Sequence, residues 1–155
     1  MAPETVPTLK LLSGPEIPVL GLGTYPLDNN EAERVVARAL EVGYRLIDTA
    51  ENYRNEEGVG RALRASGVER AQVFITTKFN AEWHGEELAA RAFEASARRL
   101  GVDYIDLLLI HWPNPAQDRY VDAWRGLISL REAGLVRSIG VSNFKPTHLQ
   151  RLLDE

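Results

Sequence analysis

Short apolar runs alternate along the chain with longer segments in which apolar residues recur every three or four positions. The first pattern is typical of strands and the second of amphipathic helices. Four of the helical segments end in a glycine suited to a helix C-cap, in EVG, ASG, RRLG and REAG. We expect strands at residues 20–23, 44–48, 73–78, 104–111 and 137–142.

The first helix and the N-terminal segment carry more local signals. Asn30 and Glu33 have the spacing of a capping box, and Val36 and Leu40 would lie on the apolar face that follows. The segments LKLL (9–12) and IPVL (17–20) are mostly apolar and flank the turn-forming sequence SGPE. This arrangement predicts a short hairpin ahead of the alternating units.

Strands that alternate with helices imply βαβ units and a parallel sheet. The continuous apolar run IDLLLI suits a strand in a sheet that is covered on both faces. No linker or low-complexity stretch divides the sequence. We therefore expect one α/β domain over residues 1–155.

Polar residues close four of the predicted strands: Asp48, Lys78, His111 and Ser142. The intervals between them are 30, 33 and 31 residues, each about one βα unit. In a parallel sheet the carboxyl ends of all strands lie at the same edge, which is where α/β folds bind ligands. The pattern therefore predicts that a carboxylate, an ammonium, an imidazole and a hydroxyl converge on one site.

Composition and charge exclude several classes of function. The net charge of −4 gives no basic footprint for nucleic acid. There is no cysteine, and the spacing of His84, His111 and His148 is not that of a zinc site, so we expect no metal. The first ten residues lack the pattern of a signal peptide, and no apolar run approaches the ~20 residues of a membrane span. We expect a cytoplasmic protein without a membrane partner.

The converging residues suit the reduction of a carbonyl group. Lys78 and Asp48 can share a partly dry site as an ion pair. A cation next to Tyr53 would make the phenol a better proton donor near neutral pH, and His111 could hold a substrate oxygen by a hydrogen bond. Because no side chain can supply a hydride, a cofactor must bring it.

Other interpretations remain open on these residues. Lys78 could act as a Schiff-base nucleophile, as in lysine-dependent aldolases, or could form a purely structural ion pair. The length also fits a five-stranded doubly wound domain that resembles flavodoxin. GLGT is not a dinucleotide fingerprint, because it lacks the third glycine and a helix directly after it.

Four motifs, in this order and spacing, resemble the aldo-keto reductases: GYRLIDTAENYRNEEGVGRAL, ITTKFN, LLLIHWP and IGVSNF. The chain is most similar to the N-terminal part of the bacterial branch that resembles diketogluconate reductases. The resemblance implies a (β/α)8 TIM barrel that binds NADPH and reduces an aldehyde, a ketone or a sugar-derived carbonyl.

The resemblance also implies roles for individual residues. The catalytic tetrad falls on Asp48, Tyr53, Lys78 and His111, with Tyr53 as the general acid. Ser142 and Asn143 match positions that hold the nicotinamide carboxamide, and Thr24, with Asp48, matches positions near the cofactor. The substrate pocket would be bordered by Tyr25, Trp83, His111 and Trp112.

A complete barrel needs about 250 residues, whereas this sequence carries about five of the eight βα units and stops at Glu155. We therefore expect an aldo-keto reductase domain that is C-terminally incomplete, with little activity by itself. The full-length form would be a monomer, and the shorter chain could self-associate through open strand edges. A non-catalytic regulatory or binding role for the same fragment stays open.

Overall fold

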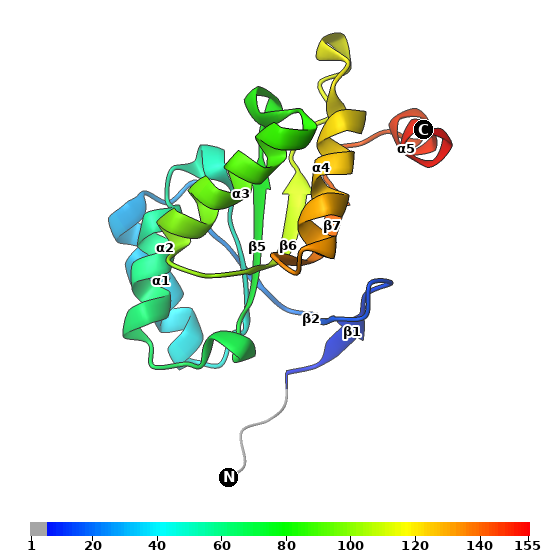
Figure 1. Ribbon diagram of the computed structural model, residues 1–155. Helices are drawn as coiled ribbons and strands as arrows, with labels where there is room; N and C mark the ends of the chain where they lie inside the picture. The colour runs from blue at the N-terminus through cyan, green and yellow to red at the C-terminus, as the bar shows by residue number, and fades with distance from the viewer. Residues whose placement is uncertain (1–5) are drawn as a thin grey trace.

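The computed structural model describes residues 6–155, so the first five of the ten residues inspected for a signal peptide lie outside this part. Five parallel strands form one sheet, in which the order of the strands is their order in the chain (Figure 1). The strands are β3 (Leu22–Gly23), β4 (Leu46–Asp48), β5 (Phe74–Phe79), β6 (Ile105–Ile110) and β7 (Val136–Val141).

Sequential strand order is that of consecutive βα units in a barrel. A flavodoxin-like domain has the order 2-1-3-4-5, with its first strand inside the sheet, whereas β3 is an outer strand here. The doubly wound alternative is therefore wrong. The predicted strands lie at the observed positions, with boundaries shifted by one or two residues.

A helix follows each of the five strands, and the first four helices contribute side chains to the core against the sheet (Figure 1). The helices within residues 6–155 are α1 (Asn29–Glu41), α2 (Glu56–Ala65), α3 (Glu86–Leu100), α4 (Tyr120–Glu132) and α5 (Pro146–Asp154). Ile47, Ile75 and Leu108 are fully buried in the core that the sheet shares with these helices. Because side chains alternate along a strand, the neighbouring positions Asp48 and Lys78 point to the opposite face.

The predicted glycine C-caps are confirmed. Gly43, Gly67, Gly101 and Gly134 have φ angles of +105°, +67°, +70° and +74°. Other L-residues rarely adopt this conformation, so glycine lets each helix stop where the chain must turn back toward the next strand.

The predicted capping box of the first helix is wrong by two residues. Asp28 is the N-cap, and its carboxylate accepts from the Glu31 amide while the Glu31 carboxylate accepts from the Asp28 amide. The predicted partner Glu33 forms an ion pair with Arg61 of α2 at 2.6 Å. Asp28 with Glu31 and Asn30 with Glu33 both have the spacing of a capping box. Glu33 pairs with Arg61 of α2 instead, and Glu31 completes the observed box.

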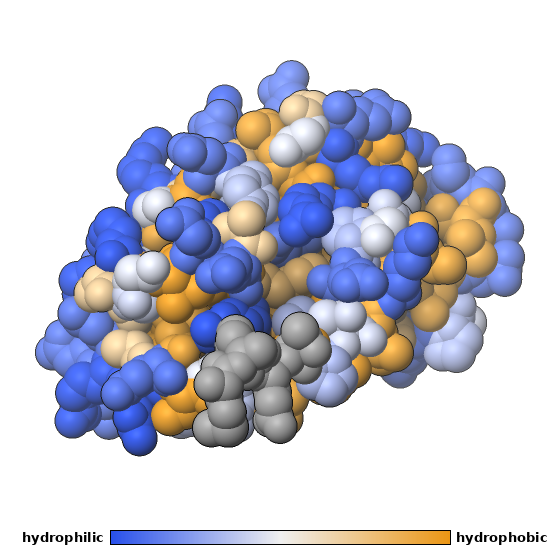
Figure 2. All heavy atoms as spheres, turned by 90° about the horizontal axis from the view of Figure 1, so that it is seen from below, coloured by the Kyte–Doolittle hydropathy of each residue, from blue (hydrophilic) through white to orange (hydrophobic). Residues whose placement is uncertain are grey.

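The predicted hairpin is confirmed as β1 (Thr8–Lys10) and β2 (Glu16–Pro18), which pair antiparallel. It lies at the amino ends of β6 and β7 (Figure 1), where the hydroxyls of Ser13 and Ser138 are 2.6 Å apart. A cavity of about 1100 Å³ is lined by the hairpin and by residues at the amino ends of β5, β6 and β7. Seen from below, Figure 2 shows hydrophilic and hydrophobic residues intermixed on this face.

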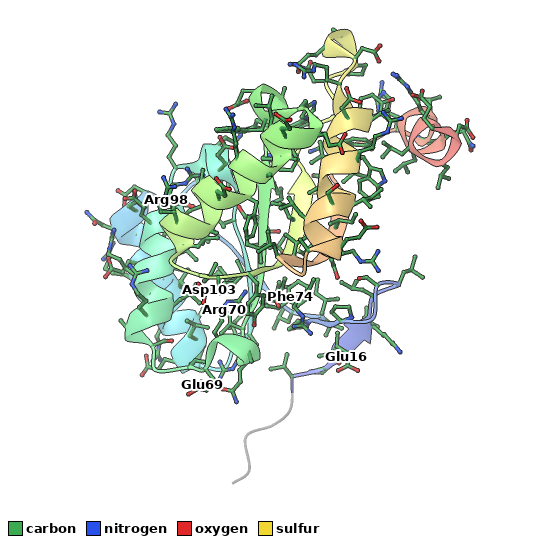
Figure 3. The ribbon with its side chains drawn as sticks, viewed as in Figure 1. Glu16, Glu69, Arg70, Phe74, Arg98 and Asp103 are labelled. Atoms are coloured by element: carbon green, nitrogen blue, oxygen red, sulfur yellow. The ribbon has the colours of Figure 1, made fainter. Side chains whose placement is uncertain are left out.

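The buried carboxylate of Asp106 holds this amino-terminal end together. It pairs with Arg70 at 2.7 Å and with Arg137 of β7 at 3.1 Å, and it accepts from the Ile75 amide of β5. Arg70 lies near the amino end of the sheet, beside Phe74, in Figure 3. Both carboxylate oxygens are thus bonded, which offsets the cost of burying the charge.

Within residues 6–155, no helix is both long and apolar enough to cross a membrane.

Gly58 of α2 allows the close approach of α1. A Cβ atom at this position would overlap with the backbone carbonyl of Asn29, whose side chain accepts from the Gly58 amide at 2.7 Å.

We expect Gly58→Ala to lower the free energy of unfolding by about 1–3 kcal/mol, the usual cost of overpacking. Chemical denaturation measures this change. Gly23→Ala is the matched control, because nothing lies within 4 Å of the Cβ position there, and an equal effect of both variants would contradict the packing argument.

The outer strands β3 and β7 have no further neighbour among residues 6–155, so backbone groups along these edges can pair with another chain. We expect the average mass in sedimentation velocity to rise above that of a monomer as concentration increases. A constant monomer mass over the same range would show that the edges do not drive association.

Candidate active site

The predicted polar residues meet at the carboxyl ends of the strands. Asp48 is the last residue of β4, Lys78 is the next to last of β5, and His111 and Ser142 directly follow β6 and β7. The ladder continues through the last two, because the His111 amide donates to Phe79 O at 3.0 Å and the Ser142 amide to Ile110 O at 2.8 Å. The register places all four on the face of the sheet away from the helices.

Lys78 and Asp48 form the predicted ion pair. Lys78 is only 7% exposed, and its Nζ lies 2.7 Å from Asp48 Oδ1 and 2.8 Å from the carbonyl oxygen of Thr49. A buried ammonium group is costly unless acceptors replace its lost water, and two acceptors do so here. Asp48, whose side chain is 40% exposed, keeps part of its hydration.

Tyr53 folds back toward this pair through a single turn of 3₁₀ helix, η1 (Glu51–Tyr53). Arg54 follows in the left-handed conformation, with φ +56°, and ends the turn. Lys78 Nζ lies 5.2 Å from the centroid of the Tyr53 ring, within the range of a cation–π contact. The ring of His111 contacts the same ring edge-on at 5.9 Å.

His111 is buried, and its surroundings favour the neutral imidazole. Burial is the largest cause that lowers its pKa below the ordinary value of 6.5, and the nearby Lys78 charge adds to it, while Asp48 acts in the opposite direction. Its Nδ1 atom is buried and has no hydrogen-bond partner among residues 6–155. A neutral imidazole at this position can hold an oxygen without competing with Tyr53 as an acid.

Aromatic side chains border the group. Tyr25 packs against Tyr53 with ring centroids 5.2 Å apart, and Trp112 stacks against His111 at 6.3 Å. Both are exposed at their outer sides, by 72% for Tyr25 and 53% for Trp112. Trp83 is half-buried against the core, and it reaches the group through a hydrogen bond from Nε1 to Glu51 Oε1 at 2.6 Å.

The predicted cofactor residues differ in what their side chains offer. Asn143 donates from its amide nitrogen to His111 O and to Ser142 Oγ, both at 3.0 Å, so its amide oxygen stays available as an acceptor. This donor and acceptor set, beside the Ser142 hydroxyl, fits a carboxamide. Thr24 is fully buried instead, and its hydroxyl donates to Thr49 Oγ1 at 2.9 Å. Its predicted role near a cofactor stays a prediction.

Asn55 is an organising residue that the sequence interpretation missed. It is fully buried, accepts from Thr49 Oγ1 at 2.8 Å, and donates to the carbonyl oxygens of Thr24 and Leu27, both at 2.9 Å. It thereby joins the loops that follow β3 and β4. An asparagine directly before a helix looks like an ordinary N-cap, but the side chain makes no capping bond here, so no sequence signal separates the two roles.

Glu56 was missed for a similar reason. It is buried in the first turn of α2, where its carboxylate accepts from Thr77 Oγ1 and pairs with Arg99 Nε, both at 2.6 Å. In the sequence it is one of two adjacent glutamates and resembles a solvated helix position.

Comparison with known proteins gives one consistent family. The model of the Aldo/keto reductase family matches residues 19–155. Methylglyoxal reductase DkgA of Yersinia pestis is 55% identical over 150 residues, which are 96% of this chain and 53% of that protein. 2,5-diketo-D-gluconic acid reductase B of a Corynebacterium species is 50% identical over 150 residues, 97% of this chain and 54% of that protein.

A solved structure has the same fold. The Bombyx mori aldo-keto reductase in complex with NADP superimposes with a TM-score of 0.89 at 38% identity, covering 97% of this chain and 54% of that chain. The chain therefore spans about half the length of the curated relatives and the structure that it matches.

The burial of His84 predicts that the stability of the fold depends on pH. It is fully buried beside Phe79, and neither ring nitrogen has a hydrogen-bond partner among residues 6–155. Burial is the largest cause that lowers its pKa below 6.5; Arg119 lowers it further, and Glu82 acts oppositely. The folded state thus binds a proton at His84 less readily than the unfolded state does. The free energy of unfolding is therefore undiminished above about pH 6.5 and falls as the pH drops through the lowered pKa.

We expect the free energy of unfolding to fall less between pH 7.5 and pH 5 in His84→Leu than in the parent chain. This interval is roughly the range in which an ordinary histidine titrates. Denaturant titrations at both pH values measure the difference. Equal losses in the two proteins would show that His84 does not contribute.

Proposed function

The chain belongs to the aldo/keto reductase family, and from this membership we propose that its site takes part in the NADPH-dependent reduction of aldehyde or ketone carbonyls to alcohols. The observation that carries the proposal is the contact of one phenol, Tyr53, with both the Lys78–Asp48 ion pair and the neutral imidazole of His111. A proton donor, a charge that stabilises its conjugate base and a group that orients an oxygen are the parts that carbonyl reduction needs.

Each residue has a distinct task in this reaction. His111 donates a hydrogen bond to the substrate oxygen and holds it near Tyr53. As the carbonyl carbon gains a hydride, the oxygen gains negative charge, and Tyr53 gives it a proton from the phenol hydroxyl. Lys78 then stabilises the phenolate, while Asp48 keeps the ammonium in place.

NADPH, when bound, supplies the hydride. Ser142 and Asn143 would hold its carboxamide, because together they offer a hydroxyl and a free amide oxygen at the edge of the site. Asp48 would lie near the cofactor, and Thr24, whose hydroxyl is already bonded to Thr49, would shape the loop near the nicotinamide ribose. The complex of the Bombyx mori relative with NADP supports this cofactor.

The substrate would be a small molecule with a reactive carbonyl group. The names of the relatives mention methylglyoxal and 2,5-diketo-D-gluconic acid, which are both small carbonyl compounds. Tyr25 and Trp112 would border it, as exposed aromatic rings beside Tyr53 and His111, and Trp83 would do so from the next loop.

The lysine-nucleophile alternative fits these contacts less well. A Schiff base needs a neutral amine with a free lone pair, whereas Lys78 uses its Nζ to donate to Asp48 and to Thr49. The binding-module alternative has no contact that favours it over reduction.

We expect Tyr53→Phe to lower the reduction of methylglyoxal by about 10²–10⁴-fold, the usual contribution of a general acid. The loss of NADPH absorbance measures turnover. Tyr44→Phe is the matched control, since Tyr44 precedes the amino end of β4 and lines the cavity at that end of the sheet. Unchanged turnover in Tyr53→Phe would contradict the mechanism.

The same preparation separates catalysis from binding through the quenching of tryptophan fluorescence by NADPH. A binding role would be supported if NADPH quenched the fluorescence saturably, if Asn143→Ala weakened this binding, and if no carbonyl were reduced. A folded chain that shows no quenching would mean that these 155 residues do not hold the cofactor by themselves.

A further inference from the structure

We propose that Glu51 is a positioning residue, which holds the Trp83 indole at the border of the site and ties it to the turn that carries Tyr53. The contact is independent of the reaction, whereas its effect on a substrate rests on the function proposed above. Glu51 and Trp83 are 32 residues apart in the chain and meet through the 2.6 Å hydrogen bond from Nε1 to Oε1.

Both partners lie on short turns that follow neighbouring strands. Glu51 begins η1 after β4, and Trp83 ends η3 (Ala81–Trp83) after β5. Glu51 and Tyr53 share one turn, which is closed by hydrogen bonds from Tyr53 N to Ala50 O and from Arg54 N to Glu51 O, both at 3.1 Å. A shift of Glu51 therefore moves the backbone of Tyr53, and the indole anchors the turn from outside.

Glu51 differs from the structural carboxylates of the fold. Glu56 and Asp106 are buried with both oxygens bonded and with arginine partners. Glu51 forms no ion pair within residues 6–155, and its Oε2 is buried without a partner. A carboxylate that is left half satisfied costs stability, so packing alone gives no reason for a glutamate there. Its one bond goes to a side chain that is predicted to border the substrate.

The charge of Glu51 suits this task. A hydrogen bond from an indole N–H to a carboxylate is shorter and stronger than one to a neutral oxygen, and the indole N–H is only a donor. Burial is the main cause that raises the pKa of Glu51 above 4.5, and the bond from Trp83 opposes it. The contact therefore helps to keep the carboxylate ionised where water is scarce.

A spectroscopic test needs no turnover. In a Trp112→Phe/Trp124→Phe background, the fluorescence reports Trp83 alone. We expect Glu51→Leu to shift the emission to longer wavelength and to raise its quenching by acrylamide about two-fold or more, because the freed indole becomes more exposed. Glu51→Gln keeps an acceptor and should stay near the parent, and Glu57→Leu, an exposed neighbour on α2, is the matched control.

A kinetic test addresses the substrate. We expect Glu51→Leu to raise the KM for methylglyoxal by about five- to tenfold with a smaller change in kcat, and to add no further rise in a Trp83→Phe background. The proposal would be overturned if acrylamide quenched Trp83 equally in the parent and in Glu51→Leu. It would also be overturned if Glu51→Leu and Trp83→Phe had additive effects on KM. If Glu51→Leu does not fold, Glu51→Gln replaces it in the fluorescence test and Trp83→Phe replaces it in the kinetic test. Emission and acrylamide quenching typical of a fully solvent-exposed Trp83 in Glu51→Gln would also overturn the proposal. A chain without turnover would count against the proposed function, while the fluorescence result would still decide the role of Glu51.

Discussion

The ion pair of Lys78 with Asp48 is the interaction on which the site depends. A lysine that is 7% exposed needs acceptors in place of water, and the carboxylate of Asp48 and the carbonyl oxygen of Thr49 supply them. Once the ammonium group is held there, it contacts the ring of Tyr53 and adds to the effect of burial, which is the main cause of the lowered pKa of His111. One buried charge thus organises an acid, a neutral imidazole and a carboxylate within a single edge of the sheet.

Buried and part-buried hydrogen bonds join the loops around the site. Asn55 joins the loops after β3 and β4, and Glu51 joins the loops after β4 and β5 through Trp83. Loops are usually the most mobile parts of a fold, so bonds between neighbouring loops give the site its rigidity. Below the sheet, Asp106 does the same for the amino ends of the strands through two arginines.

The architecture was predictable because its signals are local or periodic. The four C-cap glycines stand at positive φ as expected, and strand positions followed from apolar runs to within one or two residues. The capping box was placed two residues late, since Asp28 and Asn30 both precede a glutamate at the right spacing and only the contact of Glu33 with Arg61 distinguishes them. Sequential strand order likewise excluded the doubly wound alternative, which length alone could not do.

The sequence by itself determined the α/β class, the alternation of units and the meeting of Asp48, Lys78 and His111 at one edge, because strand period and unit length are properties of the chain. Tertiary structure alone decided the partners of Thr24, Glu51, Asn55 and Glu56. These side chains are short or ordinary polar residues, and each has a partner 21 to 43 positions away along the chain. A contact of that kind leaves no periodic trace, since it forms only when separate loops and helices come together on folding.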